Sequence, residues 1–135
     1  MDKFIRDNLP QDIQLVMNLK TLIESHYKVN RDPGFYSQLL NISLKRLNRL
    51  VALYLGSTVY QLLQERVHIE VIRLLKYSTL SVKQISFELG VCDTSYFTHC
   101  FKKLTGMCPL KFRKMYRDLS FFKDVGDAQV RLMRL

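Results

Sequence analysis

The amino-acid sequence predicts an all-α fold in which two similar helical halves are joined by a long central helix. Apolar residues recur at spacings of three and four along most of the chain, which is the period of an amphipathic helix. Residues that cap helix starts alternate with Gly or Asn at the expected helix ends. No segment shows the two-residue alternation that would indicate a half-buried strand. These observations predict helices throughout.

The first part of the chain is expected to begin with two helices. One runs from about Pro10 to Tyr27, and its apolar residues share one helical face, namely Ile13, Val16, Met17, Ile23 and Tyr27. A shorter helix begins after Asp32, a good capping residue, and has Pro33 in its first turn. It ends near Leu40, because Asn41 tolerates the left-handed conformation that closes many helices.

Two longer helices are expected to follow. Ser43 suits the cap of a helix that runs to about Leu55 and ends at Gly56. Residues 59–76 (VYQLLQERVHIEVIRLLK) then form the long central helix, whose apolar positions cover much of its circumference. A helix that is apolar on most sides is expected to be buried.

The second half of the chain repeats this plan. Ser81 and Gln84 have the spacing of a capping box, which opens a short helix that Gly90 ends. Asp93 is expected to cap the next helix, which ends at Gly106. The order of short helix, tight turn and second helix therefore occurs in both halves.

Four segments follow from these boundaries. Residues 1–57 hold the N-terminal helix and the first motif, and residues 58–77 form the linker helix. Residues 78–119 hold the second motif and a following helix. Residues 120–135 are expected to form a C-terminal tail, with a last turn or two of helix after Asp127.

The two motifs match each other, except that the second holds one extra residue between its turn and its second helix. Leu47 and Arg49 in the first match Phe97 and His99 in the second, at the same distance from the Gly that ends the helix. Each copy has the order of a helix-turn-helix, whose second helix fits the major groove of B-DNA. The sequence thus predicts two helix-turn-helix subdomains joined by the long helix. Two such helices one duplex turn apart, about 34 Å, would occupy successive major grooves without a dimer.

The second helix of each motif is expected to be apolar inside and polar outside. The core residues are expected to be Leu47, Leu50, Val51, Phe97, Phe101 and Leu104. The side chains expected to face outward are Lys45, Arg46, Asn48, Arg49, Thr94, Ser95, Thr98, His99 and Lys102. Arg pairs with guanine and Asn with adenine, while Ser and Thr bind bases or phosphates. The outward faces are therefore suited to DNA.

The chain is basic, with 21 Lys and Arg against 12 Asp and Glu and a formal charge of +9. No acidic residue lies between Asp93 and Asp118. Such a surface suits a polyanion, either a nucleic acid or an anionic membrane. A membrane is disfavoured, since the apolar residues are committed to the core. We expect DNA phosphates to be contacted by Arg46, Lys102, Lys103, Lys111, Arg113 and Lys114.

Several other classes of protein are disfavoured. The Cys residues are odd in number and lack a CxxC pair, which fits a cytoplasmic protein. The longest uncharged stretch, residues 50–64, is too short to span a bilayer, and residues 1–9 do not form a signal peptide. No catalytic motif is present, so neither an enzyme nor a cofactor is expected. No metal site is expected, because zinc-ligand spacing is absent from the set Cys92, His99, Cys100 and Cys108.

Two segments carry a family resemblance: LSVKQISFELGV at residues 80–91 and DTSYFTHCFKKLTGMCPLKFR at residues 93–113. They resemble the C-terminal signature of the DNA-binding domain of AraC/XylS transcription regulators, and a looser likeness extends over roughly residues 10–114. The resemblance implies two helix-turn-helix motifs bridged by a long helix, which bind promoter DNA and usually activate transcription. By position it implies base contacts from Lys45, Asn48, Arg49, Thr94, Ser95, Thr98 and His99.

The sequence departs from the family pattern in the first motif and in its domain content. Ala52 and Leu53 stand where the family often has basic residues. Members usually carry a sensor domain too, so the chain is either a short stand-alone regulator or one piece of a longer one. RNA polymerase is a further expected partner. The alternative function is a protein-interaction module, in which Ala52, Leu53 and Tyr54 dock a sensor domain or partner helix.

Overall fold

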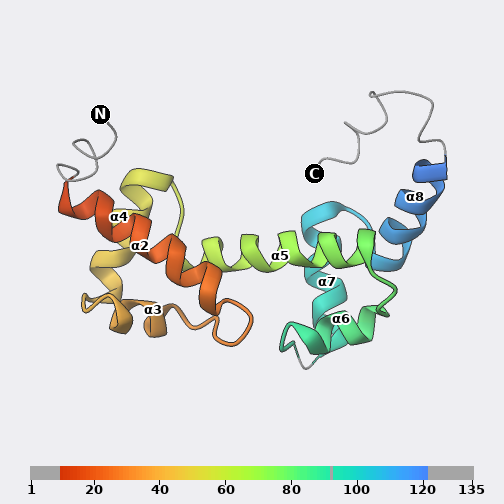
Figure 1. Cartoon of the computed structure of the whole chain (residues 1–135), viewed down its shortest axis with the longest axis horizontal. Coiled ribbons are helices and arrows are strands. Elements are labelled where there is room, and N and C mark those ends of the chain that lie inside the picture. Colours follow the sequence, from red (N-terminus) through yellow and green to blue (C-terminus); the bar gives the residue numbers. More distant parts are fainter. Residues whose placement is uncertain (1–9, 92, 122–135) are drawn as a thin grey trace. The chain divides into compact units, whose positions relative to one another are not determined.

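A computed structural model describes residues 10–91 and 93–121, and the regular elements in these ranges are all helices (Figure 1). The prediction of an all-α fold is confirmed. The helices are α2 (Gln11–His26), α3 (Pro33–Leu39), α4 (Leu44–Leu55), α5 (Val59–Tyr77), α6 (Val82–Glu88), α7 (Thr94–Thr105) and α8 (Pro109–Phe121). The turn expected after Asp127 lies outside the described residues. The chain forms two compact units, Met1–Val67 and His68–Leu135, and α5 contributes residues to both.

The helices begin and end close to the predicted positions, because nearby side chains satisfy their terminal backbone groups. The Ser43 hydroxyl caps α4 by accepting a hydrogen bond from the Arg46 N–H at 3.1 Å. The Asp93 carboxylate accepts from two backbone N–H groups at the start of α7. Ser81 opens α6 with the predicted capping box. Asn41, which follows α3, has the expected left-handed backbone with a φ of 62°.

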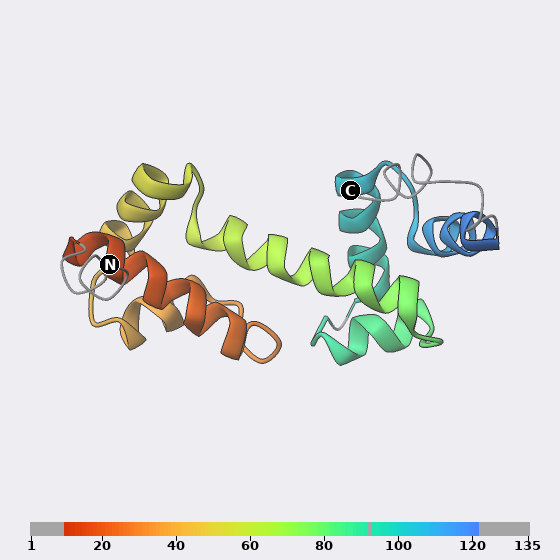
Figure 2. The ribbon, with the colours of Figure 1, turned by 45° about the horizontal axis from the view of Figure 1, so that its top comes forward.

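In the first unit, α2 packs against α3 and α4 (Figures 1 and 2). The buried apolar side chains are Val16, Leu19, Ile23, Tyr27, Tyr36, Leu47, Leu50, Val51, Val59 and Leu63. The predicted core face of α2 is wrong at Met17, which is 44% exposed, whereas Leu19 is fully buried. Val16 and Leu19 share a face, while Met17 is turned by about 100° from Val16 around the helix axis.

In the second unit, α7 packs against both α6 and α8. Phe101 lies in the core, where its ring centroid is 5.6 Å from that of Phe112 and 5.7 Å from that of His68. The prediction that Leu104 joins this core is wrong, because its side chain is 61% exposed. The buried residues of α7 are Phe97 and Phe101. Thr105 is half-buried, and its hydroxyl donates to the Phe101 carbonyl at 2.8 Å.

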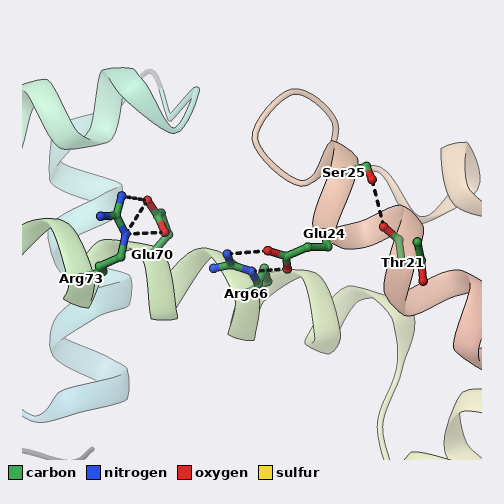
Figure 3. A network of polar contacts seen from close by, with 6 residues as sticks. All are labelled: Thr21, Glu24, Ser25, Arg66, Glu70 and Arg73. Atoms are coloured by element: carbon green, nitrogen blue, oxygen red, sulfur yellow. Dashed lines mark hydrogen bonds and ion pairs between the residues drawn. The ribbon is translucent and has the colours of Figure 1, made fainter.

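An ion pair joins α2 to α5 within the first unit (Figure 3). Two nitrogens of Arg66 donate to the two carboxylate oxygens of Glu24 at 2.7 and 2.9 Å. The Arg66 guanidinium also lies over the ring of Tyr27, 4.4 Å from its centroid. The hydrogen bonds from Arg66 lower the pKa of Glu24. These contacts link the end of α2 to the first half of α5.

The long helix α5 is less buried than its composition predicts. Tyr60 is 52% exposed and Ile69 is 59% exposed, so apolar side chains also lie on its open side. Its buried positions include Val59 and Leu63 in the first unit and Val71 and Leu75 in the second. Over the part of the chain that the structure describes, no helix has both the length and the apolar character needed to cross a membrane.

Candidate nucleic-acid interface

The helix α4 is the second helix of the first helix-turn-helix, and its two faces differ sharply. Leu47, Leu50 and Val51 are buried against the rest of the unit, as predicted. The opposite face exposes Lys45, Arg46 and Arg49. Arg46 lies 3.4 Å from the carboxylate of Asp12, and both side chains are solvent-exposed. Such an exposed pair is weak, so it holds Arg46 loosely beside α2.

Asn48 does not face outward as the sequence predicts. Its side chain is half-buried, and its Oδ1 accepts a hydrogen bond from the backbone N–H of Val59 at 3.0 Å. Val59 is the first residue of α5, and the first N–H groups of a helix have no partner inside it. The side chain of Asn48 therefore serves the start of the next helix, and we assign it no base contact.

The helix α7 is the second helix of the second motif. Ser95, His99, Lys102 and Lys103 are exposed, as predicted. Thr94 and Thr98 are half-buried at the edge of this face. The hydroxyl of Thr94 lies 3.3 Å from that of Ser86 on α6, so it also links the two helices of the motif.

The basic residues of α8 fall into two groups. Lys111 and Lys114 are exposed, as their predicted contacts with phosphate require, and Arg117 is exposed on the same helix. Arg113 is only 8% exposed, and its guanidinium donates to backbone carbonyls at the end of α5. The prediction that Arg113 contacts phosphate is corrected, because a side chain held inside the unit cannot reach a DNA backbone.

The exposed face of α7 also includes Tyr96, which sequence reasoning did not name. This ring is 57% exposed on α7, between Ser95 and Phe97, and it stands one helical turn before His99. Its place in the family signature was the available signal.

The structure also reveals an exposed apolar end of α4, where Leu53 is 71%, Tyr54 41% and Leu55 37% exposed.

The structure describes three of the four residues that the sequence analysis considered as zinc ligands. Cys92 lies outside the described residues. Cys100 and Cys108 are half-buried free thiols, and His99 is exposed. Within residues 10–91 and 93–121, no three His, Cys, Asp or Glu side chains gather closely enough to hold a metal ion.

Two helix-turn-helix motifs, each exposing basic and polar side chains on its second helix, define a DNA-binding protein. A family model described as a helix-turn-helix domain matches residues 36–115, more than half of the chain. The chain belongs to this family, and within it to the DNA-binding domains of the AraC/XylS transcription regulators.

A sequence relative and a solved structure support this assignment. The chain is 32% identical over 114 residues to the uncharacterized HTH-type transcriptional regulator YfiF of Bacillus subtilis (strain 168). That match covers 84% of this chain but only 30% of the relative. The C-terminal domain of AraT, a response regulator from Geobacillus stearothermophilus, is 25% identical with a TM-score of 0.70, and the match covers 75% of this chain and 84% of that one.

The DNA-binding domain of AdpA, described as a global transcriptional factor and solved in complex with a target DNA, also has this fold. It is 20% identical with a TM-score of 0.70, over 76% of this chain and 92% of that one. The predicted fold, with two helix-turn-helix subdomains joined by a long helix, is confirmed.

Proposed function

We propose that the chain binds double-stranded promoter DNA sequence-specifically, with α4 and α7 inserted into successive major grooves of one duplex. The observation that carries this proposal is the exposed polar face of both helices. Arg49 on α4 and His99 on α7 occupy equivalent places in the two motifs, and both are exposed. The opposite face of each helix is buried, so only this face is open to a groove.

Each base-reading side chain has a role set by its chemistry. Arg49 donates two parallel hydrogen bonds to a guanine, which is the commonest specific contact in the major groove. Lys45, one turn earlier on α4, reaches a base on the same side of the helix. On α7 each side chain forms a single hydrogen bond with a base, through a hydroxyl or an imidazole. These side chains are Thr94, Ser95, Thr98 and His99.

Phosphate contacts supply most of the affinity and fix the register on the duplex. The exposed cations suited to them are Arg46, Lys102, Lys103, Lys111 and Lys114. No acidic residue occurs in residues 94–117, so cations outnumber carboxylates along α7 and α8, where Asp118 is the acidic residue. Phosphates on either side of one groove would be held by this second unit.

Selection from a pool of random duplexes tests the proposal. We expect the chain to enrich a defined site and to bind it at least ~1,000-fold more tightly than a scrambled duplex, as specific DNA-binding proteins do. Binding to both duplexes should weaken steeply between about 50 and 200 mM salt. Equal binding to the two duplexes at every salt concentration would contradict sequence-specific recognition.

We also propose that the bound chain activates transcription through contact with RNA polymerase, which is supported by the family resemblance. A reporter gene placed behind the selected site should be expressed more strongly when the chain is present. Unchanged or reduced expression, with the site occupied, would contradict activation. Purified polymerase should be recruited to the site by the chain in a gel-shift experiment.

A second candidate function is a protein-interaction module, and the exposed apolar end of α4 favours it. Ala52, Leu53 and Tyr54 are exposed, and the first two stand where the family often has basic residues. In this alternative they dock a sensor domain or a partner helix. Binding to random duplex at low salt separates the two functions, because an adaptor without DNA-binding activity leaves the duplex unshifted.

A further inference from the structure

One hydrogen bond ties the recognition helix of the first motif to the helix that follows it. The Oδ1 of Asn48, near the middle of α4, accepts from the N–H of Val59 at the start of α5, at 3.0 Å. Thr58 and Gln61 satisfy other backbone groups at this helix start through their own side chains. Asn48 is therefore the acceptor that comes from a different helix.

In the second motif, the first residue of the following helix has no N–H that needs an acceptor. Thr98 occupies the place of Asn48, and Pro109 occupies the place of Val59 as the first residue of the following helix. Pro has no N–H, and it is well tolerated at the first position of a helix. Because Pro109 has no N–H, the start of α8 needs no acceptor from Thr98 at this place.

We infer that Asn48 is a positioning residue for DNA recognition, which fixes α4 against α5 and thereby aims Arg49 at its base. This inference rests on the proposed reading of bases by α4. Asn48 and Arg49 are neighbours on one helix, and Val59 is fully buried in the core of the same unit. A rotation of α4 about its own axis would stretch the bond from Asn48 and would move Arg49 away from its target.

The test compares variants that keep or lose the acceptor oxygen. Asn48→Asp keeps an oxygen in place and adds a negative charge, which is favourable at a helix N-terminus. Asn48→Ala removes the oxygen. Affinities of the full chain for the selected duplex and for a scrambled duplex are measured by fluorescence anisotropy, and their ratio is the readout. Asn18→Ala on α2 is the control, since Asn18 is exposed and lies outside the interface.

We expect Asn48→Ala to lower the ratio by about tenfold, the loss typical of a misplaced base contact. Asn48→Asp should keep the ratio within about twofold, while its charge weakens binding to both duplexes alike. Asn18→Ala should leave both affinities unchanged. A ratio lost equally in Asn48→Asp and Asn48→Ala would overturn the inference, because it would mean that the side-chain amide reads a base itself.

A second experiment removes the donor instead of the acceptor. Val59→Pro places a proline at the first position of α5, as Pro109 is placed in α8. The N–H that Asn48 binds is then absent, so Asn48 has no donor left at this position. We expect Asn48→Ala to cause no further loss of the ratio when it is added to Val59→Pro. A full additional loss would overturn the inference. If the unsubstituted chain fails to discriminate between the duplexes, the proposed function fails and this inference fails with it.

Discussion

The guanidinium of Arg113 is hydrogen-bonded to the end of α5, where its Nε donates to the carbonyl of Leu75 at 3.1 Å. Its Nη2 also donates to the carbonyl of Leu74 at 3.3 Å. The Leu74 carbonyl also accepts from the N–H and the hydroxyl of Ser78. The cation of Arg113 adds a partner for these last carbonyls and complements the helix dipole. A residue from the middle of the basic segment thus holds α8 to α5 within the second unit.

Replacing this residue should therefore affect folding and not the contact with DNA phosphates. We expect Arg113→Met, which keeps much of the aliphatic stem, to lower the free energy of unfolding by about 1.5–3 kcal/mol, since it removes charged hydrogen bonds to buried carbonyls. Urea denaturation measures this loss. At a temperature where the variant is folded, its salt dependence of DNA binding should equal that of the unsubstituted chain. A changed salt dependence with unchanged stability would return Arg113 to the interface.

Lys114, the neighbour of Arg113, provides the matched contrast. Its side chain is exposed, so its removal should leave stability almost unchanged. We expect Lys114→Ala to weaken binding to all duplexes evenly and to reduce the slope of log affinity against log salt by about one unit. Titrations at several salt concentrations measure this slope. Lys102→Ala should behave in the same way, and an unaltered slope in either variant would remove that residue from the phosphate contacts.

Arg49 should determine the choice of base at one position. We expect Arg49→Ala to cost about 1–3 kcal/mol on the selected site and to relax the preference at a single base pair. Lys20→Ala, on the exposed surface of α2, is the control and should change neither property. If Arg49→Ala discriminates between selected and scrambled duplexes as well as the unsubstituted chain does, α4 does not read bases through this residue.

His68 should make the stability of the second unit depend on pH. Burial beside the ring of Phe101 lowers the pKa of His68 below its usual value near 6.5. The unfolded chain therefore binds a proton at a higher pH than the folded chain does. The stabilisation is complete above about pH 6.5 and is lost as the pH falls toward the folded pKa, with a slope of at most about 1.4 kcal/mol per pH unit.

Urea denaturation at pH 7.5, 6.5 and 5.5 measures this dependence, and His68→Gln is the comparison. The variant is expected to be less stable at pH 7.5 because it loses the ring contact, but its stability should fall less between pH 7 and 5.5. The Glu24 ion pair does not confuse this comparison, because the pKa of that carboxyl is lowered and its stabilisation is lost only as the pH falls below about 4.5. Parallel pH profiles for the two proteins would show that His68 does not titrate on unfolding.

Helix ends were predictable because their signals are local. Ser43 and Asp93 bind backbone groups two or three residues away, so a short stretch of sequence contains both partners. The choice between adjacent apolar residues was less predictable. Leu104 and Met17 are exposed because the packing of neighbouring helices decides which face of a helix is buried. A small rotation of the helix about its axis buries a different apolar residue.

Partners that are distant in the chain were not predictable from sequence spacing. Asn48 binds the N–H of Val59, 11 residues away, and Arg113 binds the carbonyl of Leu75, 38 residues away. Both residue types are common in DNA interfaces, so composition favoured that role for them. Their structural role follows from helix ends that only the folded unit brings beside them.

The central claim is that α4 and α7 read two neighbouring turns of one duplex. Site selection repeated with Arg49→Ala and with His99→Ala tests it most directly. We expect each variant to lose preference in a different part of the site, and the two parts to lie about 10 base pairs apart, one helical turn of DNA. Loss of preference at the same base pairs in both variants, or in neither, would contradict it.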